Sequence, residues 1–86
     1  MAMVTVRYWA AAKHAAGVAE EILAAGTLAE MVAAVLARHP AAPGLEGVLA
    51  RSSFLIDGEA AGTRPPENVS LPEGAVVEVL PPFAGG

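Results

Sequence analysis

The two residues whose types most clearly suggest a reaction are the last two in the sequence, Gly85 and Gly86. A glycine pair has no side chains, so it can enter a narrow channel and let another backbone approach closely. The backbone carboxylate of Gly86 has an ordinary pKa of about 3.5, so it is ionised and unreactive at neutral pH. Adenylation by ATP would turn one of its oxygens into a leaving group, and a sulfur nucleophile could then displace AMP to leave a thiocarboxylate. The sequence thus predicts chemistry on the main chain of Gly86 that needs no catalytic side chain.

The residues before the glycines predict a stiff, projecting arm. Two successive prolines cannot donate to a sheet ladder and favour an extended path, and residues 81–86 reach roughly 20 Å when extended. We therefore divide the chain into a domain over residues 1–80 and a tail over residues 81–86. An apolar side chain on an exposed arm favours docking. We expect partner contacts from the apolar residues in and beside the tail, Leu80, Pro81, Pro82, Phe83 and Ala84.

Side-chain chemistry of the usual kinds is not indicated. The 86 residues contain no cysteine, which excludes a disulfide framework, a thiolate metal site and a cysteine nucleophile. His14 and His39 lie far apart in the sequence and lack metal-ligand spacing, so we expect no metal. Ser52 and Ser53 have no histidine nearby in sequence, which argues against a hydrolase triad. We expect no bound cofactor and no turnover without a partner; ATP would be consumed by an activating enzyme.

The composition predicts a folded, acidic protein. Hydrophobic residues make up 55% of the chain, charged residues 16%, and the formal net charge is −4. An acidic protein of this size repels a phosphate backbone, so we expect no nucleic-acid partner. The apolar runs are too short for a membrane span, and the strand-like N-terminus does not resemble a signal peptide. We therefore expect a cytoplasmic protein that does not contact membranes.

Residues 27–39 form the clearest predicted helix. Thr27 is a natural N-cap, and Glu30 three residues later completes a capping box. Apolar residues recur at helical spacing and make one stripe, Leu28, Met31, Val32, Val35 and Leu36. Arg38 and His39 fall in the last turn, where positive groups complement the helix dipole, and Pro40 prevents continuation. A helix with one apolar stripe is expected to pack against one surface through that stripe.

Strands are predicted on both sides of this helix. Alternation indicates a strand over residues 3–9, and shorter apolar stretches indicate strands at 20–23, 53–56 and 75–80, with a brief return strand near 60–61. Short helical turns are predicted at 10–16 and 45–50, and a loop at 64–73. The first and last strands are the most apolar, so we expect them to lie centrally. The fold class is therefore α+β: a β-grasp with a mixed sheet of four or five strands and one main helix on one face.

The other face of this sheet is expected to stay partly open. Trp9 points opposite to the presumed core, where it is either partly buried under a loop or an anchor for a partner protein. Lys13 and His14 are expected at a solvated helix end. Glu20 and Glu21 are expected to form a solvated strand edge that discourages edge pairing.

The C-terminal residues 71–86, LPEGAVVEVLPPFAGG, resemble the end of the small subunit of molybdopterin synthase and of its thiamin-biosynthesis sulfur-carrier relatives. Residues 6–13, VRYWAAAK, resemble the first strand of that family and the alanine-rich turn after it. The helix near residues 28–39 and the turn at Asp57-Gly58 fall where the family has them. The resemblance covers nearly the whole chain, and the tail is its specific part.

This resemblance implies a ubiquitin-like β-grasp fold and a sulfur-carrier function. A ubiquitin-activating-like enzyme would adenylate Gly86, whose carboxylate is then converted to a thiocarboxylate. In molybdopterin synthase the tail inserts into the large subunit and donates sulfur to a pterin precursor, so a sulfur-accepting large subunit is the implied second partner.

Three alternatives stay open. The sulfur could serve thiamin, cysteine or another metabolite, because the tail is shared among these carriers. The activated glycine could instead join lysines of target proteins, as in a ubiquitin-like modifier. The chain could also be a plain binding module with an inert tail.

Overall fold

The secondary structure follows the predicted order closely. The structure is a computed structural model, and it describes residues 2–82. The elements in chain order are β1 (Met3–Tyr8), α1 (Ala10–Ala16), β2 (Glu20–Ala24), α2 (Leu28–Arg38), α3 (Leu45–Arg51), β3 (Ser53–Ile56), β4 (Glu59–Ala60), the 3-10 helix η1 (Pro66–Asn68) and β5 (Val76–Leu80). No helix in this described part of the chain is long and apolar enough to span a bilayer.

The five strands form one mixed sheet in the order β2-β1-β5-β3-β4. β1 pairs antiparallel with β2 and parallel with β5, while β3 runs antiparallel to both β5 and β4. The expectation that the first and last strands lie inside the sheet is therefore confirmed. Because β1 and β5 are parallel neighbours, their C-terminal ends reach the same edge of the sheet. The start of α1 and the start of the tail consequently lie at that one edge.

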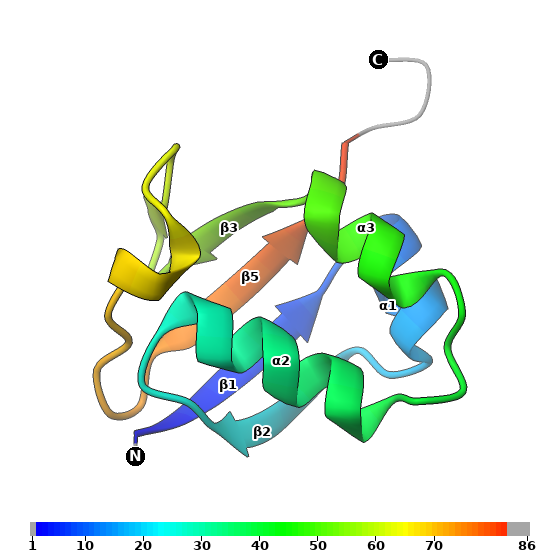
Figure 1. Ribbon diagram of the computed structural model, residues 1–86, viewed down its shortest axis with the longest axis horizontal. Helices are drawn as coiled ribbons and strands as arrows, with labels where there is room; N and C mark the ends of the chain where they lie inside the picture. Colours follow the sequence, from blue (N-terminus) through cyan, green and yellow to red (C-terminus); the bar gives the residue numbers. More distant parts are fainter. Residues whose placement is uncertain (1, 83–86) are drawn as a thin grey trace.

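One face of the sheet carries the core. Val4, Val6 and Tyr8 of β1 are buried together with Val77 and Val79 of β5. The helices supply the opposing apolar side chains, chiefly Leu28, Met31, Val35, Leu45 and Leu49. Figure 1 shows α2 crossing this face of β1, with α3 and α1 at the end where β1 and β5 finish. The apolar stripe predicted for the main helix, α2, thus packs on the sheet. The two short helices α1 and α3 complete the helical layer.

The helix α2 begins as its sequence predicts. The backbone N–H of Glu30 donates to Thr27 Oγ1 at 3.1 Å, and Glu30 Oε1 accepts from the backbone N–H of Thr27 at 3.1 Å. These reciprocal bonds satisfy two N–H groups that no helical carbonyl can reach. The capping box is confirmed, and it fixes where α2 starts over the sheet.

The connection between β3 and β4 needs a left-handed turn. Asp57 and Gly58 have φ angles of 50° and 87°, and aspartate and glycine both tolerate this region. The Asp57 carboxylate also accepts a hydrogen bond of 2.9 Å from the backbone N–H of Val76. This bond ties the turn to the beginning of β5.

Two details differ from the sequence-based expectations. The loop at 64–73 contains η1 and an isolated bridge between Thr27 and Ser70. The prediction that Glu21 is solvated is wrong, because its side chain is only 11% exposed. The antiparallel register places Glu21 opposite Val6, and so on the helix-covered side, while Ile22 faces outward and is 59% exposed.

Candidate functional site

The root of the tail lies where β5 leaves the sheet. Leu80 is half-buried and pairs with Ser53 of β3. Pro81 follows it and is buried, whereas Pro82 is exposed. A proline has no N–H for the ladder, so the strand ends here for a covalent reason. Phe83, Ala84, Gly85 and Gly86 lie outside the described residues, and their predicted roles stay predictions.

The predicted docking residues at the tail root differ in how accessible they are. A buried side chain offers a partner little surface, so Pro81 contributes by fixing the direction in which the chain leaves the sheet. Pro82 is the first exposed residue of the tail. Leu80 lies between these cases, because it is partly accessible on the sheet face that no described helix covers.

Trp9 lies beside this root. It follows β1 directly and is 46% exposed. Its backbone N–H donates to the carbonyl of Val79 at 3.3 Å, and its indole Nε1 donates to Glu78 Oε2 at 3.1 Å. The register that pairs Tyr8 with Val79 places Trp9 next to Leu80. The structure therefore brings together Trp9, Leu80 and the start of the tail, and their role in partner binding stays a prediction.

A polar network that sequence analysis missed lies behind this surface. Tyr8 Oη donates to the Glu21 carboxylate, which also contacts His39 Nε2 at 2.7 Å. Arg38 Nη1 lies 3.5 Å from the same carboxylate and donates to the carbonyl of Ile22 at 2.8 Å. The network links β1, β2 and the end of α2. A buried tyrosine hydroxyl needs a hydrogen-bond partner. The core-facing position of Tyr8 in β1 was therefore the one feature of the sequence that could have indicated this network.

The network also sets the charge of its central carboxylate. Burial by itself raises the pKa of Glu21, but hydrogen bonds from Tyr8 and His39 and the charges of His39 and Arg38 outweigh it. The pKa of Glu21 is therefore lowered, and the carboxylate stays ionised at neutral pH. Burial and the neighbouring Glu21 carboxylate raise the pKa of the Tyr8 hydroxyl, so Tyr8 stays protonated.

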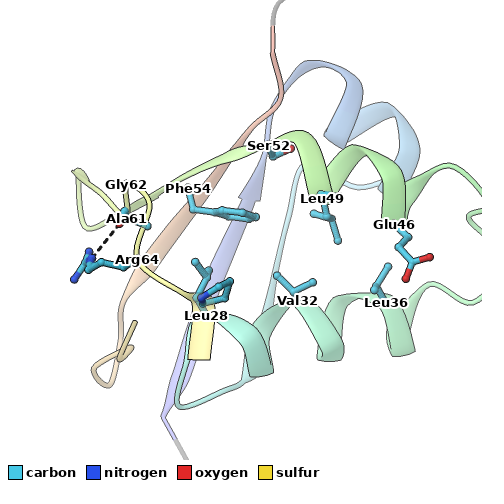
Figure 2. A pocket seen from close by; sticks show the side chains of 12 residues that line it. Leu28, Val32, Leu36, Glu46, Leu49, Ser52, Phe54, Ala61, Gly62 and Arg64 are labelled. Atoms are coloured by element: carbon cyan, nitrogen blue, oxygen red, sulfur yellow. Dashed lines mark hydrogen bonds between the residues drawn. The ribbon is translucent and has the colours of Figure 1, made fainter. Parts of the chain in front are cut away.

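An apolar groove lies on the helix side of the molecule, between α2, α3 and β3 (Figure 2). Its volume is about 370 Å³, and its apolar lining comes mainly from Leu28, Val32, Leu36, Leu49 and Phe54. Ser52 is its one hydroxyl group, and that hydroxyl donates to the carbonyl of Val48 at 2.7 Å. The lining of the groove contains no histidine, so Ser52 lacks the usual base of a nucleophilic triad.

Residues 2–82 contain no cluster of three or more histidine, aspartate or glutamate side chains that could hold a metal ion. The Glu21 carboxylate, whose pKa is lowered, is engaged in hydrogen bonds with Tyr8 and His39. The chemistry predicted at the main chain of Gly86 stays a prediction, because Gly86 lies outside the described residues.

Comparison with known proteins identifies the family of the chain. A model of the ThiS family matches residues 6–86, which extends from β1 through the final glycine pair. The chain belongs to the ThiS family. The molybdopterin synthase sulfur carrier subunit of Chlamydomonas reinhardtii is 31% identical to this ThiS-family protein, over 96% of this chain and 98% of the relative. The resemblance inferred from the tail is thus confirmed.

Solved structures confirm the fold of this ThiS-family protein. The small archaeal modifier protein 1 from Methanosarcina acetivorans matches with a TM-score of 0.82 and 22% identity, over 100% of this chain and 98% of that chain. A complex of subunits 1 and 2 of the molybdopterin-converting factor from Helicobacter pylori contains a match with a TM-score of 0.67 and 26% identity, over 98% and 99%. The chain has the ubiquitin-like β-grasp fold of the sulfur-carrier class.

Proposed function

We propose that this protein carries sulfur as a thiocarboxylate on Gly86 and delivers it in molybdopterin biosynthesis. The observation that carries the proposal is the match to the ThiS family from β1 through the terminal glycine pair, together with a curated sulfur-carrier relative of nearly equal length.

The proposed activation has two balanced steps. A carboxylate oxygen of Gly86 attacks the α-phosphorus of ATP, and pyrophosphate leaves to give an acyl-adenylate. Hydrosulfide from the sulfur source then attacks the carbonyl carbon, a C–S bond forms, AMP leaves with the oxygen that it bonds, and loss of one proton gives the thiocarboxylate. Both steps take place in an adenylating, ubiquitin-activating-like enzyme. We propose a cytoplasmic location, where ATP is available for this activation.

This chain contributes a binding surface beside the root of its tail. The paired ends of β1 and β5 hold Trp9 and Leu80 beside the tail root. A partner can therefore bind this surface of the domain while the tail enters the partner's active site. Pro81 and Pro82 prevent the tail from continuing the sheet. The two glycines then fit a channel that side chains would block.

The proposed acceptor is a large subunit of the molybdopterin synthase kind. Its support is the name of the 31% identical relative and the two-subunit assembly of the Helicobacter pylori structure. A thiamin pathway acceptor would use the same activated tail, so the acceptor has to be tested separately from the activation.

Intact-mass measurement tests the activation. The chain is incubated with ATP, an adenylating enzyme and a sulfur source, and we expect a mass gain that corresponds to one oxygen replaced by sulfur. A matched variant that lacks Gly86 should gain nothing. An unchanged mass of the full chain, with an adenylating enzyme shown to be active on its own carrier, would contradict the proposal.

Single-turnover transfer then tests the acceptor. The thiocarboxylate form is mixed with a molybdopterin synthase large subunit and its pterin precursor, and in parallel with a thiazole-forming enzyme of thiamin biosynthesis. We expect return of the carrier to the carboxylate mass only in the first mixture. Transfer only in the second would move the protein to the thiamin pathway.

A further inference from the structure

The chain holds a single lysine, Lys13, against four arginines. An arginine guanidinium stays protonated in proteins and does not act as an amine nucleophile. The chain also lacks cysteine, and acyl esters or acyl-imidazoles formed at hydroxyl or histidine side chains are less stable than an amide. Lys13 is therefore the one side chain on which an activated Gly86 carbonyl would leave a lasting amide.

Lys13 also lies close to the tail root. It is exposed on α1, and its backbone N–H donates to the Trp9 carbonyl at 3.3 Å. The Trp9 N–H in turn donates to the Val79 carbonyl at 3.3 Å, so two hydrogen bonds connect the Lys13 backbone to the C-terminal end of β5. Figure 1 shows α1 at the end of the sheet where β5 finishes.

The Lys13 amine is available in this arrangement. Within residues 2–82, the Lys13 ammonium forms no ion pair, and the ion pairs present there involve Arg38 and His39. Six residues, 81–86, can span roughly 20 Å when extended, and only two hydrogen bonds of 3.3 Å separate the Val79 carbonyl from the Lys13 backbone. A reaction within one chain also benefits from an effective concentration on the order of millimolar.

We propose that Lys13 is an internal acylation site: when the Gly86 adenylate is not consumed by sulfur, the Lys13 amine of the same chain captures it. The unprotonated Nζ attacks the Gly86 carbonyl carbon, a C–N bond forms, the bond to the AMP oxygen breaks, and AMP and one proton leave. The product is an internal amide between Lys13 and Gly86. It removes the free carboxylate and so withdraws the carrier from the sulfur cycle. This inference rests on the proposed adenylation.

The test uses the full chain with ATP and the adenylating enzyme, and with no sulfur source. Pyrophosphate exchange reports adenylation separately. We expect a monomer lighter by one water, a Lys13–Gly86 linkage in its tandem mass spectrum, and a rate per molecule that does not depend on protein concentration. If exchange itself is absent, the proposed function and this inference both fall.

Two variants make the test specific. Lys13→Arg keeps the positive charge and should keep pyrophosphate exchange while losing the internal amide. The double variant Lys13→Arg/Arg64→Lys restores one exposed lysine in the loop after β4, on the opposite side of Figure 1 from α1, and should not restore the amide. With exchange intact, the inference is overturned by a linkage between two chains, by a linkage at another residue, by full recovery in the double variant, or by no linkage at all.

Discussion

The indole Nε1 of Trp9 donates a hydrogen bond of 3.1 Å to Glu78 Oε2, which joins the residue after β1 to the open face of β5. This bond holds a large, 46% exposed aromatic ring beside Leu80 and the start of the tail. Aromatic side chains of this kind are enriched among the residues that dominate binding energy. The domain therefore presents a fixed aromatic contact next to the root of the tail, whose last residue, Gly86, carries the proposed chemistry.

Replacing Trp9 by alanine should weaken binding to the adenylating enzyme with little effect on folding. A hot-spot truncation costs about 2 kcal/mol, or roughly 30-fold in Kd. Isothermal titration with the enzyme measures Kd, and thermal unfolding measures stability. Ile22→Ala is the matched control, because Ile22 is 59% exposed on the same face but lies on the edge strand β2. Equal losses of affinity in the two variants would contradict a specific role of Trp9.

Replacing Glu21 by glutamine should lower stability in a pH-dependent way. At neutral pH the loss is about 1–3 kcal/mol, because buried partners lose a charged acceptor. The pKa of Glu21 is lowered in the folded state, so its contribution is complete above the unfolded pKa of about 4.3 and is lost as pH falls through the lower folded value. The difference in unfolding free energy between the wild type and the variant should therefore shrink as pH falls below about 4.

Urea unfolding at a series of pH values measures this difference. Glu20→Gln is the control, because Glu20 is exposed and an exposed substitution changes stability by less than about 0.5 kcal/mol. A Glu21→Gln variant whose stability deficit stays constant across the acidic range would show that the charge of Glu21 does not hold the network together.

Replacing Thr27 by alanine should destabilise α2 by about 1 kcal/mol, because the Glu30 N–H loses its acceptor at the helix start. Thr27→Ser keeps the hydroxyl and should cost much less. Chemical denaturation measures both. Thr27 lies outside the surface around Trp9, so adenylation of either folded variant should match the wild type; a selective loss of adenylation would mean that the start of α2 takes part in partner binding.

Much of the fold could be predicted because local signals agreed with the tertiary structure. The alternation in β1, the capping box of α2 and the turn at Asp57-Gly58 each specify an element by themselves. The central position of β1 and β5 followed from their apolar faces. These features depend on short-range chemistry that the sequence carries directly.

The position of Glu21 could not be predicted in the same way. Ile22 and Leu23 are adjacent apolar residues, so the pattern of β2 does not say which of them faces the core. The pairing register with β1 decides it, and this buries Leu23 and Glu21 on the helix side. The partners of Glu21 come from β1 and the end of α2, which only the tertiary fold brings together.

The chemistry predicted at the candidate site stays a prediction, and part of the surroundings of the site could not be predicted from the sequence. The glycine pair, the prolines and Trp9 were recognisable from residue type and order. The burial of Pro81 and the bond from Trp9 to Glu78 depend on how β5 lies between its neighbours, and no spacing in the sequence reports that.

Blocking the terminal carboxylate tests the central claim most directly. Two semisynthetic forms of the chain, one ending in the free acid of Gly86 and one ending in its amide, are compared in ATP–pyrophosphate exchange with the adenylating enzyme. We predict exchange with the acid and none with the amide, while both forms keep the same fold and bind the enzyme. Exchange that persists with the amide would contradict the account.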